Sequence, residues 1–282
     1  MTTSQEIASV TDENSSKTIV VNGLNIHYND IGAGDPIICI HGGGPGASGW
    51  SNFRGNLQDI ALKNRVLLFD MPGWGRSEYS GSDEPWHDFI SNILAGFMDA
   101  LGLETSDFIG NSMGGQAVIK LAINSPKRVK HLVMIGSQPT GAIAVQAEPL
   151  EGLNNIAKYY RGGPTPEKMR ILVESLVHDS SWLTDEVVSE RYEVSATPEA
   201  LQQAQLRAKQ PRHDLYFELD KITVPTLIIW GINDKGGALE VGLLMLRRLK
   251  DARMVIFQNC GHWAQVEKRE EFDHVVLDFF AH

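Results

Sequence analysis

Short apolar runs alternate with amphipathic stretches along most of this chain, a pattern typical of a parallel sheet covered by helices on both faces. Buried strands are predicted at residues 36–40, 65–69, 106–109, 128–136, 226–230 and 253–257. Amphipathic helices are predicted at residues 86–101, 115–124 and 268–280. Near the start, strands at 18–21 and 24–30 flank Asn22-Gly23, a dipeptide typical of a two-residue hairpin turn. We therefore predict an α/β fold with a mostly parallel central sheet.

The alternation stops between residues 137 and 219. This segment contains amphipathic helical stretches, such as 166–177 and 184–194, but no clear buried strand. An insertion at this point of an open α/β sheet lies over the carboxyl ends of the strands, where ligands bind. We therefore predict a core domain formed by residues 17–136 and 220–282, a helical lid at residues 137–219, and a disordered polar tail at residues 1–16.

Composition and charge narrow the classes of function. The chain has 282 residues and a formal net charge of −10, which argues against binding nucleic acid, because that binding relies on lysine and arginine. No apolar run approaches the length of a membrane span, and the first residues lack the pattern of a signal peptide. We predict a soluble, cytoplasmic protein with no nucleic-acid partner and no membrane partner.

A G-x-S-x-G motif lies between a predicted strand and a predicted helix. Residues 110–114 read Gly-Asn-Ser-Met-Gly. In this context the motif is typical of the nucleophile elbow of serine hydrolases, where glycine allows close backbone approach and the helix N-terminus faces the substrate. Ser112 is therefore the candidate nucleophile. Because glycine is abundant in this chain, the motif needs support from a base and an acid in the right order.

Both partners follow in the order that this kind of hydrolase uses, serine, then acid, then histidine. Asp234 lies in the turn just after the predicted strand 226–230, and His262 lies in the loop after strand 253–257. Each residue taken singly is also compatible with an ordinary turn aspartate or loop histidine. The three in this order predict a catalytic triad of Ser112, Asp234 and His262.

An oxyanion site is predicted where the strand 36–40 opens into the glycine-rich run 41–46. Such a run exposes backbone N–H groups, and the N–H groups of Gly43 and Met113 are the candidate pair that binds an oxyanion. A phosphate-binding loop is the competing interpretation. It is disfavoured because the run lacks both the lysine-serine ending of a P-loop and a dinucleotide-binding pattern.

Three segments together resemble the meta-cleavage-product hydrolases, which are carbon–carbon bond hydrolases of the α/β-hydrolase superfamily. They are residues 41–52, 110–115 and 260–265, within a resemblance that runs from about residue 19 to 280. This family acts on 2-hydroxy-6-oxohexa-2,4-dienoates in bacterial degradation of aromatic compounds. The resemblance therefore implies an α/β-hydrolase fold, an anionic dienoate substrate, and a homo-oligomer.

The resemblance also implies which residues bind the substrate. The family carries an arginine facing the dienoate in the segment that matches residues 189–193, which gives Arg191 that role. Without the resemblance, the favoured interpretation of Arg191 is a solvated helix arginine. The substrate-binding residues implied are Gly42, Asn52, Asn111, Leu176, Arg191 and Trp263.

The implied reaction explains why more than a triad is needed. Breaking a carbon–carbon bond expels a carbanion, so we expect the dienol first to become a keto tautomer by protonation at carbon 5. As a hypothesis, Ser112 then attacks the carbonyl at carbon 6 while His262, oriented by Asp234, moves protons and Gly43 and Met113 receive the oxyanion. The products are 2-hydroxypenta-2,4-dienoate and a carboxylic acid.

Two departures from the family pattern concern the substituent at carbon 6. Residues 235–238 read Lys-Gly-Gly-Ala where many relatives carry a bulky residue and then Val-Pro, and Leu176 stands where some relatives that process aryl substrates carry an aromatic side chain. These departures predict a pocket that tolerates an aryl group, with an alkyl group as the other option.

Two other functions stay open on the sequence alone. A carboxylesterase or lactonase shares the triad but does not need Arg191 or Trp263, and a non-catalytic small-molecule receptor can keep a hydrolase pocket. A haloalkane dehalogenase or epoxide hydrolase is disfavoured, because the elbow nucleophile of those enzymes is an aspartate. The sequence contains no metal-ligand cluster or cofactor motif, so we expect neither a metal nor a cofactor.

Overall fold

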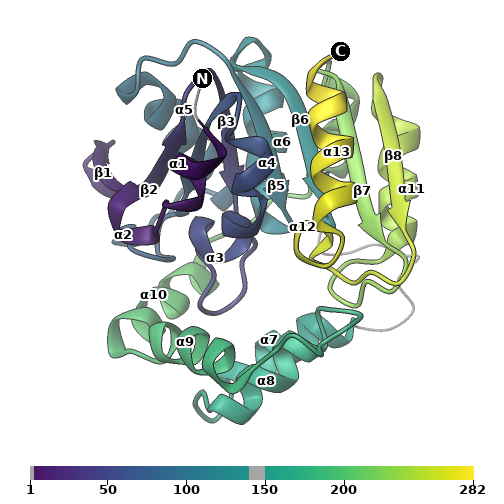
Figure 1. Ribbon diagram of the computed structural model, residues 1–282. Coiled ribbons are helices and arrows are strands. Elements are labelled where there is room, and N and C mark those ends of the chain that lie inside the picture. Colours follow the sequence, from purple (N-terminus) through teal and green to yellow (C-terminus); the bar gives the residue numbers. More distant parts are fainter. Residues whose placement is uncertain (1–2, 140–149) are drawn as a thin grey trace.

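The computed structural model describes residues 3–139 and 150–282, and within them eight strands form one sheet (Figure 1). The strands are β1 (Ser16–Val21), β2 (Leu24–Gly32), β3 (Asp35–Ile40), β4 (Asn64–Phe69), β5 (Ser106–Asn111), β6 (Val129–Ile135), β7 (Thr226–Gly231) and β8 (Ala252–Phe257). Their order in the sheet is β1-β2-β4-β3-β5-β6-β7-β8. Strand β2 pairs antiparallel with β1 and β4, and the remaining pairs are parallel. The predicted mostly parallel α/β sheet is confirmed.

Helices cover both faces of the sheet because strand side chains alternate in direction. On β3, Ile38 and Ile40 join the apolar cluster under α5 (Trp86–Ala100), α6 (Met113–Asn124) and α11 (Leu239–Arg248). Ile37 and Cys39 join the cluster on the opposite face. That face is covered by α1 (Ser4–Ala8), α3 (Gly49–Phe53), α4 (Leu57–Ile60), α12 (Ala264–Glu267) and α13 (Arg269–Phe280). Short 3-10 turns are η1 (Arg54–Asn56), η2 (Pro126–Arg128) and η3 (Tyr216–Lys221).

Among the described residues between β6 and β7, four helices form a separate layer, here called the helical insert. They are α7 (Glu151–Tyr160), α8 (Pro166–Glu174), α9 (Asp185–Ser195) and α10 (Pro198–Lys209). The carboxyl ends of the parallel strands face this layer (Figure 1). The insert has an apolar cluster of its own, which also contains Trp263 from the core. These helices fall inside the segment predicted as a lid; that they act as a lid stays a prediction, and residues 140–149 lie outside the described residues.

The start of the chain differs from the prediction of a disordered tail. Residues 3–16 contain α1 and α2 (Asp12–Ser15), and both helices begin with a capping box, at Thr3 and Thr11. Ile7 is buried in the cluster that α4 shares with the sheet, and Asn29 donates hydrogen bonds to Asp12. The prediction was wrong because reciprocal caps and one buried apolar side chain order two short polar helices. Residues 1–2 lie outside the described residues.

Within the described part of the chain, no helix combines the length and the apolar character that crossing a bilayer requires.

Candidate active site

Ser112 occupies a sharp turn between β5, which ends at Asn111, and α6, which begins at Met113. Its backbone has φ +52° and ψ −115°, in a region that non-glycine residues rarely adopt. Glycine is required on both sides of the turn. A Cβ atom on Gly110 would lie 2.4 Å from the backbone nitrogen of Gly115, and one on Gly114 would lie 2.3 Å from the carbonyl oxygen of Ile40. The motif therefore has the strand–turn–helix context of a nucleophile elbow.

Asp234 and His262 are brought together from the turns that follow β7 and β8. The Nδ1 atom of His262 lies 2.8 Å from Oδ2 of Asp234. The other carboxylate oxygen accepts the backbone N–H groups of Gly236 and Gly237 at 2.7 and 2.8 Å. The Asp234 side chain is 1% exposed, so this carboxylate is held in one orientation by three hydrogen bonds. Donation from Nδ1 leaves Nε2 of the imidazole as its free basic nitrogen.

The imidazole of His262 is also positioned by contacts that only glycine allows. A Cβ atom on Gly236 would lie 2.8 Å from Cγ of the ring, and one on Gly136 would lie 2.8 Å from Nδ1. The backbone N–H of His262 donates to the carbonyl oxygen of Leu176 at 2.7 Å. The ring therefore rests between two bare backbone segments and is tied to the helical insert.

One cavity of about 240 Å³ collects ten of the eleven site residues predicted from the sequence. They are Gly42, Gly43, Asn52, Asn111, Ser112, Met113, Leu176, Arg191, His262 and Trp263. The eleventh, Asp234, lies behind the imidazole of His262. Ser112 and His262 thus line the same cavity as the backbone of the glycine-rich run, an arrangement suited to nucleophilic attack on a carbonyl group. The individual roles of these residues stay predictions.

The glycine-rich run is held against the elbow by buried polar side chains. The His41 ring contacts the carbonyl oxygen of Gly42 at 2.7 Å through Nδ1 and accepts the N–H of Met71 at 3.0 Å through Nε2. Burial lowers the pKa of His41, so the ring is neutral at pH 7. A Cβ atom on Gly43 would lie 2.8 Å from Sδ of Met113, so the run packs directly on the start of α6.

The two asparagines predicted to bind substrate also carry structural hydrogen bonds. The Asn111 amide donates to the carbonyl oxygens of Ile135 and His262 at 3.1 and 3.3 Å. Its Oδ1 atom is buried without a hydrogen-bond partner among the described residues and faces Gly42. Oδ1 of Asn52 accepts the N–H of Gly42 at 3.4 Å. Asn52 therefore binds the glycine-rich run, and Asn111 ties the end of β5 to the histidine loop, while both side chains line the cavity.

Arg191 reaches the cavity from α9 in the helical insert. Its guanidinium carbon lies 5.0 Å from the centre of the Trp263 ring, a cation–π contact. Desolvation lowers the pKa of Arg191 to about 10, so the side chain still carries its charge at pH 7. Within the described residues no carboxylate forms an ion pair with it, and the ionisable groups that offset part of the lowering of its pKa are Tyr160 and Tyr159. An unpaired, partly buried cation beside Ser112 is suited to bind an anionic substrate.

A second arginine in the cavity was not predicted. Arg212, from the segment after α10, lies against different groups: its Nη2 atom is 3.3 Å from Sδ of Met113, and its guanidinium lies 5.3 Å from the centre of the Trp86 ring. Burial lowers its pKa. Gln116, Leu153 and Ile156 also line the cavity without having been predicted. Arg212 belongs to no predicted helix or strand, so the local sequence gives no indication that its side chain lines the cavity.

In the described part of the chain, no three histidine, cysteine, aspartate or glutamate side chains lie close enough together to hold a metal ion.

Comparison with known proteins gives a consistent relationship. Residues 35–269 match the model of the alpha/beta hydrolase fold. The chain is 38% identical over 265 residues to 2-hydroxy-6-oxononadienedioate/2-hydroxy-6-oxononatrienedioate hydrolase 2 of Pseudomonas putida, which covers 92% of each chain. It is 36% identical to 2-hydroxy-6-oxo-6-phenylhexa-2,4-dienoate hydrolase of Comamonas testosteroni, over 90% of each chain.

Solved structures agree with the sequence comparison. A meta-cleavage product hydrolase from Pseudomonas fluorescens superposes with a TM-score of 0.84 at 30% identity, covering 94% of this chain and 97% of that one. The 2-hydroxy-6-oxo-6-phenylhexa-2,4-dienoate hydrolase of Rhodococcus superposes with a TM-score of 0.86 at 26% identity, covering 95% and 98%. Since similarity in sequence and in structure extends over nearly the whole chain, this protein belongs to the meta-cleavage product hydrolase family of the alpha/beta hydrolase fold.

Proposed function

We propose that Ser112, His262 and Asp234 perform the carbon–carbon bond hydrolysis that characterises this family in aromatic degradation. The substrate is a 2-hydroxy-6-oxohexa-2,4-dienoate, cleaved between carbons 5 and 6 into 2-hydroxypenta-2,4-dienoate and a carboxylic acid. One observation carries the proposal: the cavity that holds Ser112 and His262 also holds Arg191, a cation without a carboxylate partner among the described residues. An ester-cleaving triad has no need of that charge.

Arg191 is proposed to hold the carboxylate end of the dienoate. A charge-assisted hydrogen bond to a carboxylate is strongest where water is excluded, and Arg191 lies partly buried against the Trp263 ring. Asn111 supports this assignment, because its buried Oδ1 atom lacks a partner and can accept the hydroxyl on carbon 2 of the substrate. Together these groups favour the form of the substrate in which negative charge spreads from carbon 5 to the carboxylate.

The chemical steps follow from this placement. Protonation at carbon 5 converts the dienol into its keto tautomer, so that the later departing fragment is a conjugated enolate. Nε2 of His262 accepts the proton of the Ser112 hydroxyl as its oxygen attacks carbon 6. The N–H groups of Gly43 and Met113 receive the oxyanion, and the second of these opens α6, where the helix dipole favours negative charge. Collapse of this oxyanion breaks the bond between carbons 5 and 6 and leaves an acyl group on Ser112, while the departing enolate takes up the proton held by His262 and becomes 2-hydroxypenta-2,4-dienoate. Water then releases the acid from Ser112.

The substituent at carbon 6 is proposed to carry an acidic group. The remaining wall of the cavity is apolar at Leu153, Ile156 and Leu176, but it also contains Arg212, which donates to the weakly accepting sulfur of Met113. The relative from Pseudomonas putida is named for a dioate, which has a second carboxylate, and the relative from Comamonas testosteroni is named for a phenyl substrate. The aryl-tolerant pocket predicted from the sequence stays a prediction.

A parallel assay tests the reaction type and the substituent together. The ring-opened dienoates are coloured, so their loss is followed directly, and p-nitrophenyl esters are assayed beside them. We expect turnover of the dienoates, a higher kcat/KM for 2-hydroxy-6-oxononadienedioate than for the phenyl dienoate, and loss of that preference in Arg212→Gln. Activity on esters alone would favour the carboxylesterase, and binding without turnover would favour the receptor.

We also propose that the protein is a homo-oligomer that associates through the β8 edge of its sheet. Ile256 on β8 is 41% exposed and Leu243 on the neighbouring α11 is 42% exposed. An exposed edge strand with apolar side chains is a surface that other chains pair with. Sedimentation of the wild type and of Ile256→Lys tests this: a monomeric wild type at micromolar concentration contradicts the proposal.

A further inference from the structure

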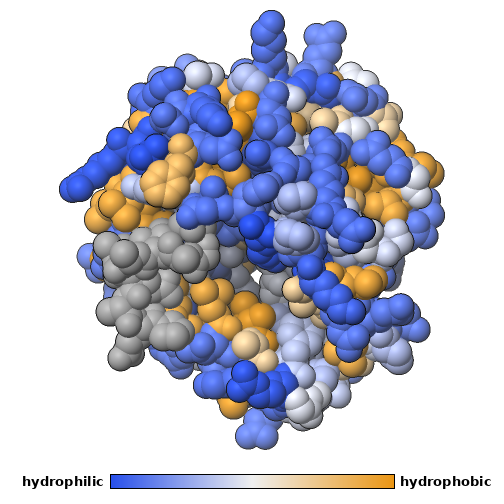
Figure 2. Space-filling view, turned by 180° about the vertical axis from the view of Figure 1, so that it is seen from behind, coloured by the Kyte–Doolittle hydropathy of each residue, from blue (hydrophilic) through white to orange (hydrophobic). Residues whose placement is uncertain are grey.

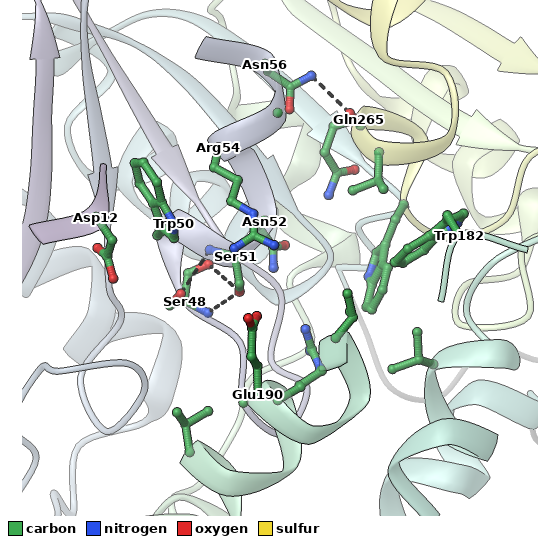
Figure 3. A pocket seen from close by; sticks show the side chains of 18 of the residues that line it. Asp12, Ser48, Trp50, Ser51, Asn52, Arg54, Asn56, Trp182, Glu190 and Gln265 are labelled. Atoms are coloured by element: carbon green, nitrogen blue, oxygen red, sulfur yellow. Dashed lines mark hydrogen bonds between the residues drawn. The ribbon is translucent and has the colours of Figure 1, made fainter. Parts of the chain in front are cut away.

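A second cavity, of about 450 Å³, adjoins the catalytic one and has no part in the chemistry proposed above (Figure 3). It lies between core residues 48–56 and α9 of the helical insert. The two cavities have Asn52, Arg191 and Trp263 in common. The space-filling view from behind also shows the surface hollowed between the core and the insert (Figure 2). The two cavities therefore lie next to each other, with Asn52, Arg191 and Trp263 between them.

The charges around this cavity favour an anion. Besides Arg191 it is lined by Arg54 and Arg269, which form no ion pair within the described residues. The Arg269 guanidinium lies flat against the backbone of Gly55, where a Cβ atom would be 2.8 Å from Nη2. Of the two acidic residues in the lining, Asp12 is already paired with Arg76 at 2.5 Å. Glu190 is the remaining negative charge.

The local surplus of positive charge matters because the whole chain is acidic. With a formal net charge of −10, the protein as a whole repels an anionic substrate. A cleft lined by cations raises the local concentration of anions and their rate of entry, and this effect weakens with ionic strength. Arg54 and Arg269 are therefore placed where they can offset the repulsion.

A buried amide gives an independent indication of a ligand. Gln265 is 1% exposed, yet neither atom of its side-chain amide has a hydrogen-bond partner among the described residues. Its backbone is held in place, because Asn56 donates to the Gln265 carbonyl oxygen at 3.0 Å. Figure 3 shows the amide extending from α12 into the cavity on the side of Asn52 and Arg54. An unpaired buried amide is costly, and a ligand with both a donor and an acceptor would remove that cost.

The dienoate itself has this pair of groups. Its carboxylate accepts hydrogen bonds and the adjacent 2-hydroxyl donates one, so Nε2 and Oε1 of Gln265 can engage both at once. The cleavage product 2-hydroxypenta-2,4-dienoate has the same end. A simple ionised carboxylate has no donor, so it would satisfy Nε2 and leave Oε1 unpaired.

We propose that this cavity is an anion-binding antechamber for 2-hydroxydienoates. Arg54 and Arg269 attract the anion, Gln265 binds its 2-hydroxy acid end, and the molecule then passes Arg191 and Trp263 into the catalytic cavity. The 2-hydroxypenta-2,4-dienoate product leaves by the same route. This inference rests on the proposed function, because it requires a dienoate substrate.

The test uses substitutions of opposite sign in the full-length protein. In the double variant Arg54→Gln with Arg269→Gln we expect kcat/KM for the dienoate to fall about fivefold to tenfold at low ionic strength, with kcat retained, and the difference to shrink at high salt. In Glu190→Gln we expect kcat/KM to rise. Arg161→Gln, an exposed arginine outside both cavities, is the matched control and should behave as the wild type.

Gln265→Leu tests the ligand contact separately. We expect about tenfold weaker inhibition by 2-hydroxypenta-2,4-dienoate with an unchanged or raised Tm, because the variant removes unpaired polar atoms as well as the contact. The proposal is overturned if the arginine and glutamate variants change kcat/KM in the same direction, if the double variant keeps the wild-type salt dependence, or if Gln265→Leu leaves product inhibition unchanged. A wild type that turns over no dienoate overturns the proposed function as well, and is recognised from the wild type alone.

Discussion

The carboxylate of Asp234 holds the imidazole of His262 at 2.8 Å, although the two residues are 28 positions apart in the chain and lie in loops after different strands. The second oxygen of this carboxylate is occupied by two backbone N–H groups, so Asp234 cannot turn away from the ring. The geometry fixes which nitrogen of His262 faces the cavity, and that nitrogen is the one a catalytic base needs.

Asp234→Asn is therefore expected to lower kcat by about a thousandfold or more, because an amide facing Nδ1 no longer selects the same tautomer of His262. The fold should be retained, since the amide oxygen can still accept the N–H groups of Gly236 and Gly237. Steady-state turnover of the dienoate and circular dichroism measure the two effects. Activity within tenfold of the wild type would show that Asp234 does not orient the base.

Ser112→Ala is expected to reduce turnover by several orders of magnitude while the coloured dienoate still binds. Alanine is smaller than serine, so the substitution should leave the close backbone contacts at Gly110 and Gly114 unchanged. Binding is measured from the absorbance change on mixing. Ser125→Ala, at the other end of α6, is the control. Near-normal turnover in Ser112→Ala would remove the covalent role from the account.

Gly236→Ala isolates the packing of the catalytic imidazole. The added Cβ atom would lie 2.8 Å from Cγ of His262, so the ring must move. We expect kcat to fall about a hundredfold with little change in Tm, because small displacements of a catalytic base are costly. Gly163→Ala is the matched control: Gly163 has φ +88° and no neighbour within 4 Å, so this variant adds backbone strain without touching the site. Equal losses of activity in both variants would contradict the steric explanation.

Arg191→Gln separates dienoate hydrolysis from simple ester hydrolysis. We expect kcat/KM for the dienoate to fall about a hundredfold, because a charge-assisted contact to the carboxylate is lost, while p-nitrophenyl ester hydrolysis changes by a few-fold at most. Both activities are measured on the same preparation, with Arg161→Gln as the control. A parallel loss of both activities would indicate damage to the triad rather than to substrate binding.

Asp273 makes stability depend on pH in a direction opposite to that of most carboxylates. It is buried beside Asn56, and desolvation raises its pKa to about 7 from a reference value of 3.8. The folded protein therefore binds more protons than the unfolded chain between these values, so the contribution is favourable at the acidic end and is lost as the pH rises through about 7.

Asp273→Asn removes this titration. At pH 8 we expect the free energy of unfolding of the variant to exceed that of the wild type by up to about 4 kcal/mol, and the difference to narrow towards pH 5. Urea unfolding at the two pH values measures it, with the exposed Asp83→Asn as the control. A difference that does not depend on pH would mean that Asp273 is ionised in the folded protein.

Features that depend on a local pattern could be predicted from the sequence. The hairpin at Asn22-Gly23 is an example: both residues have positive φ, as a tight hairpin turn between β1 and β2 requires. The elbow at Ser112 is another, because the glycines that it needs stand next to it in the chain. Predicted boundaries moved by a few residues, since β5 continues to Asn111 and α8 ends at Glu174.

Features that depend on contacts between distant segments could not be predicted from the sequence. The predicted strands correspond to β1–β8. Helices α3, α4, α7, α10, α11 and α12 were not assigned, because their apolar faces are short and are recognisable only from their packing in the fold. Arg212 and Gln265 gained their roles from cavities that the core and the insert build together. Ile7 was predicted to belong to a disordered tail because the apolar residues against which it packs lie far along the chain.

The most direct test of the central claim is hydrolysis of a 2-hydroxy-6-oxohexa-2,4-dienoate by the wild type in water enriched in oxygen-18. We predict loss of the colour, equal amounts of 2-hydroxypenta-2,4-dienoate and carboxylic acid, and label in the carboxyl group of the acid. A dienoate that stays intact, while esters are hydrolysed by the same preparation, would contradict carbon–carbon bond cleavage at Ser112.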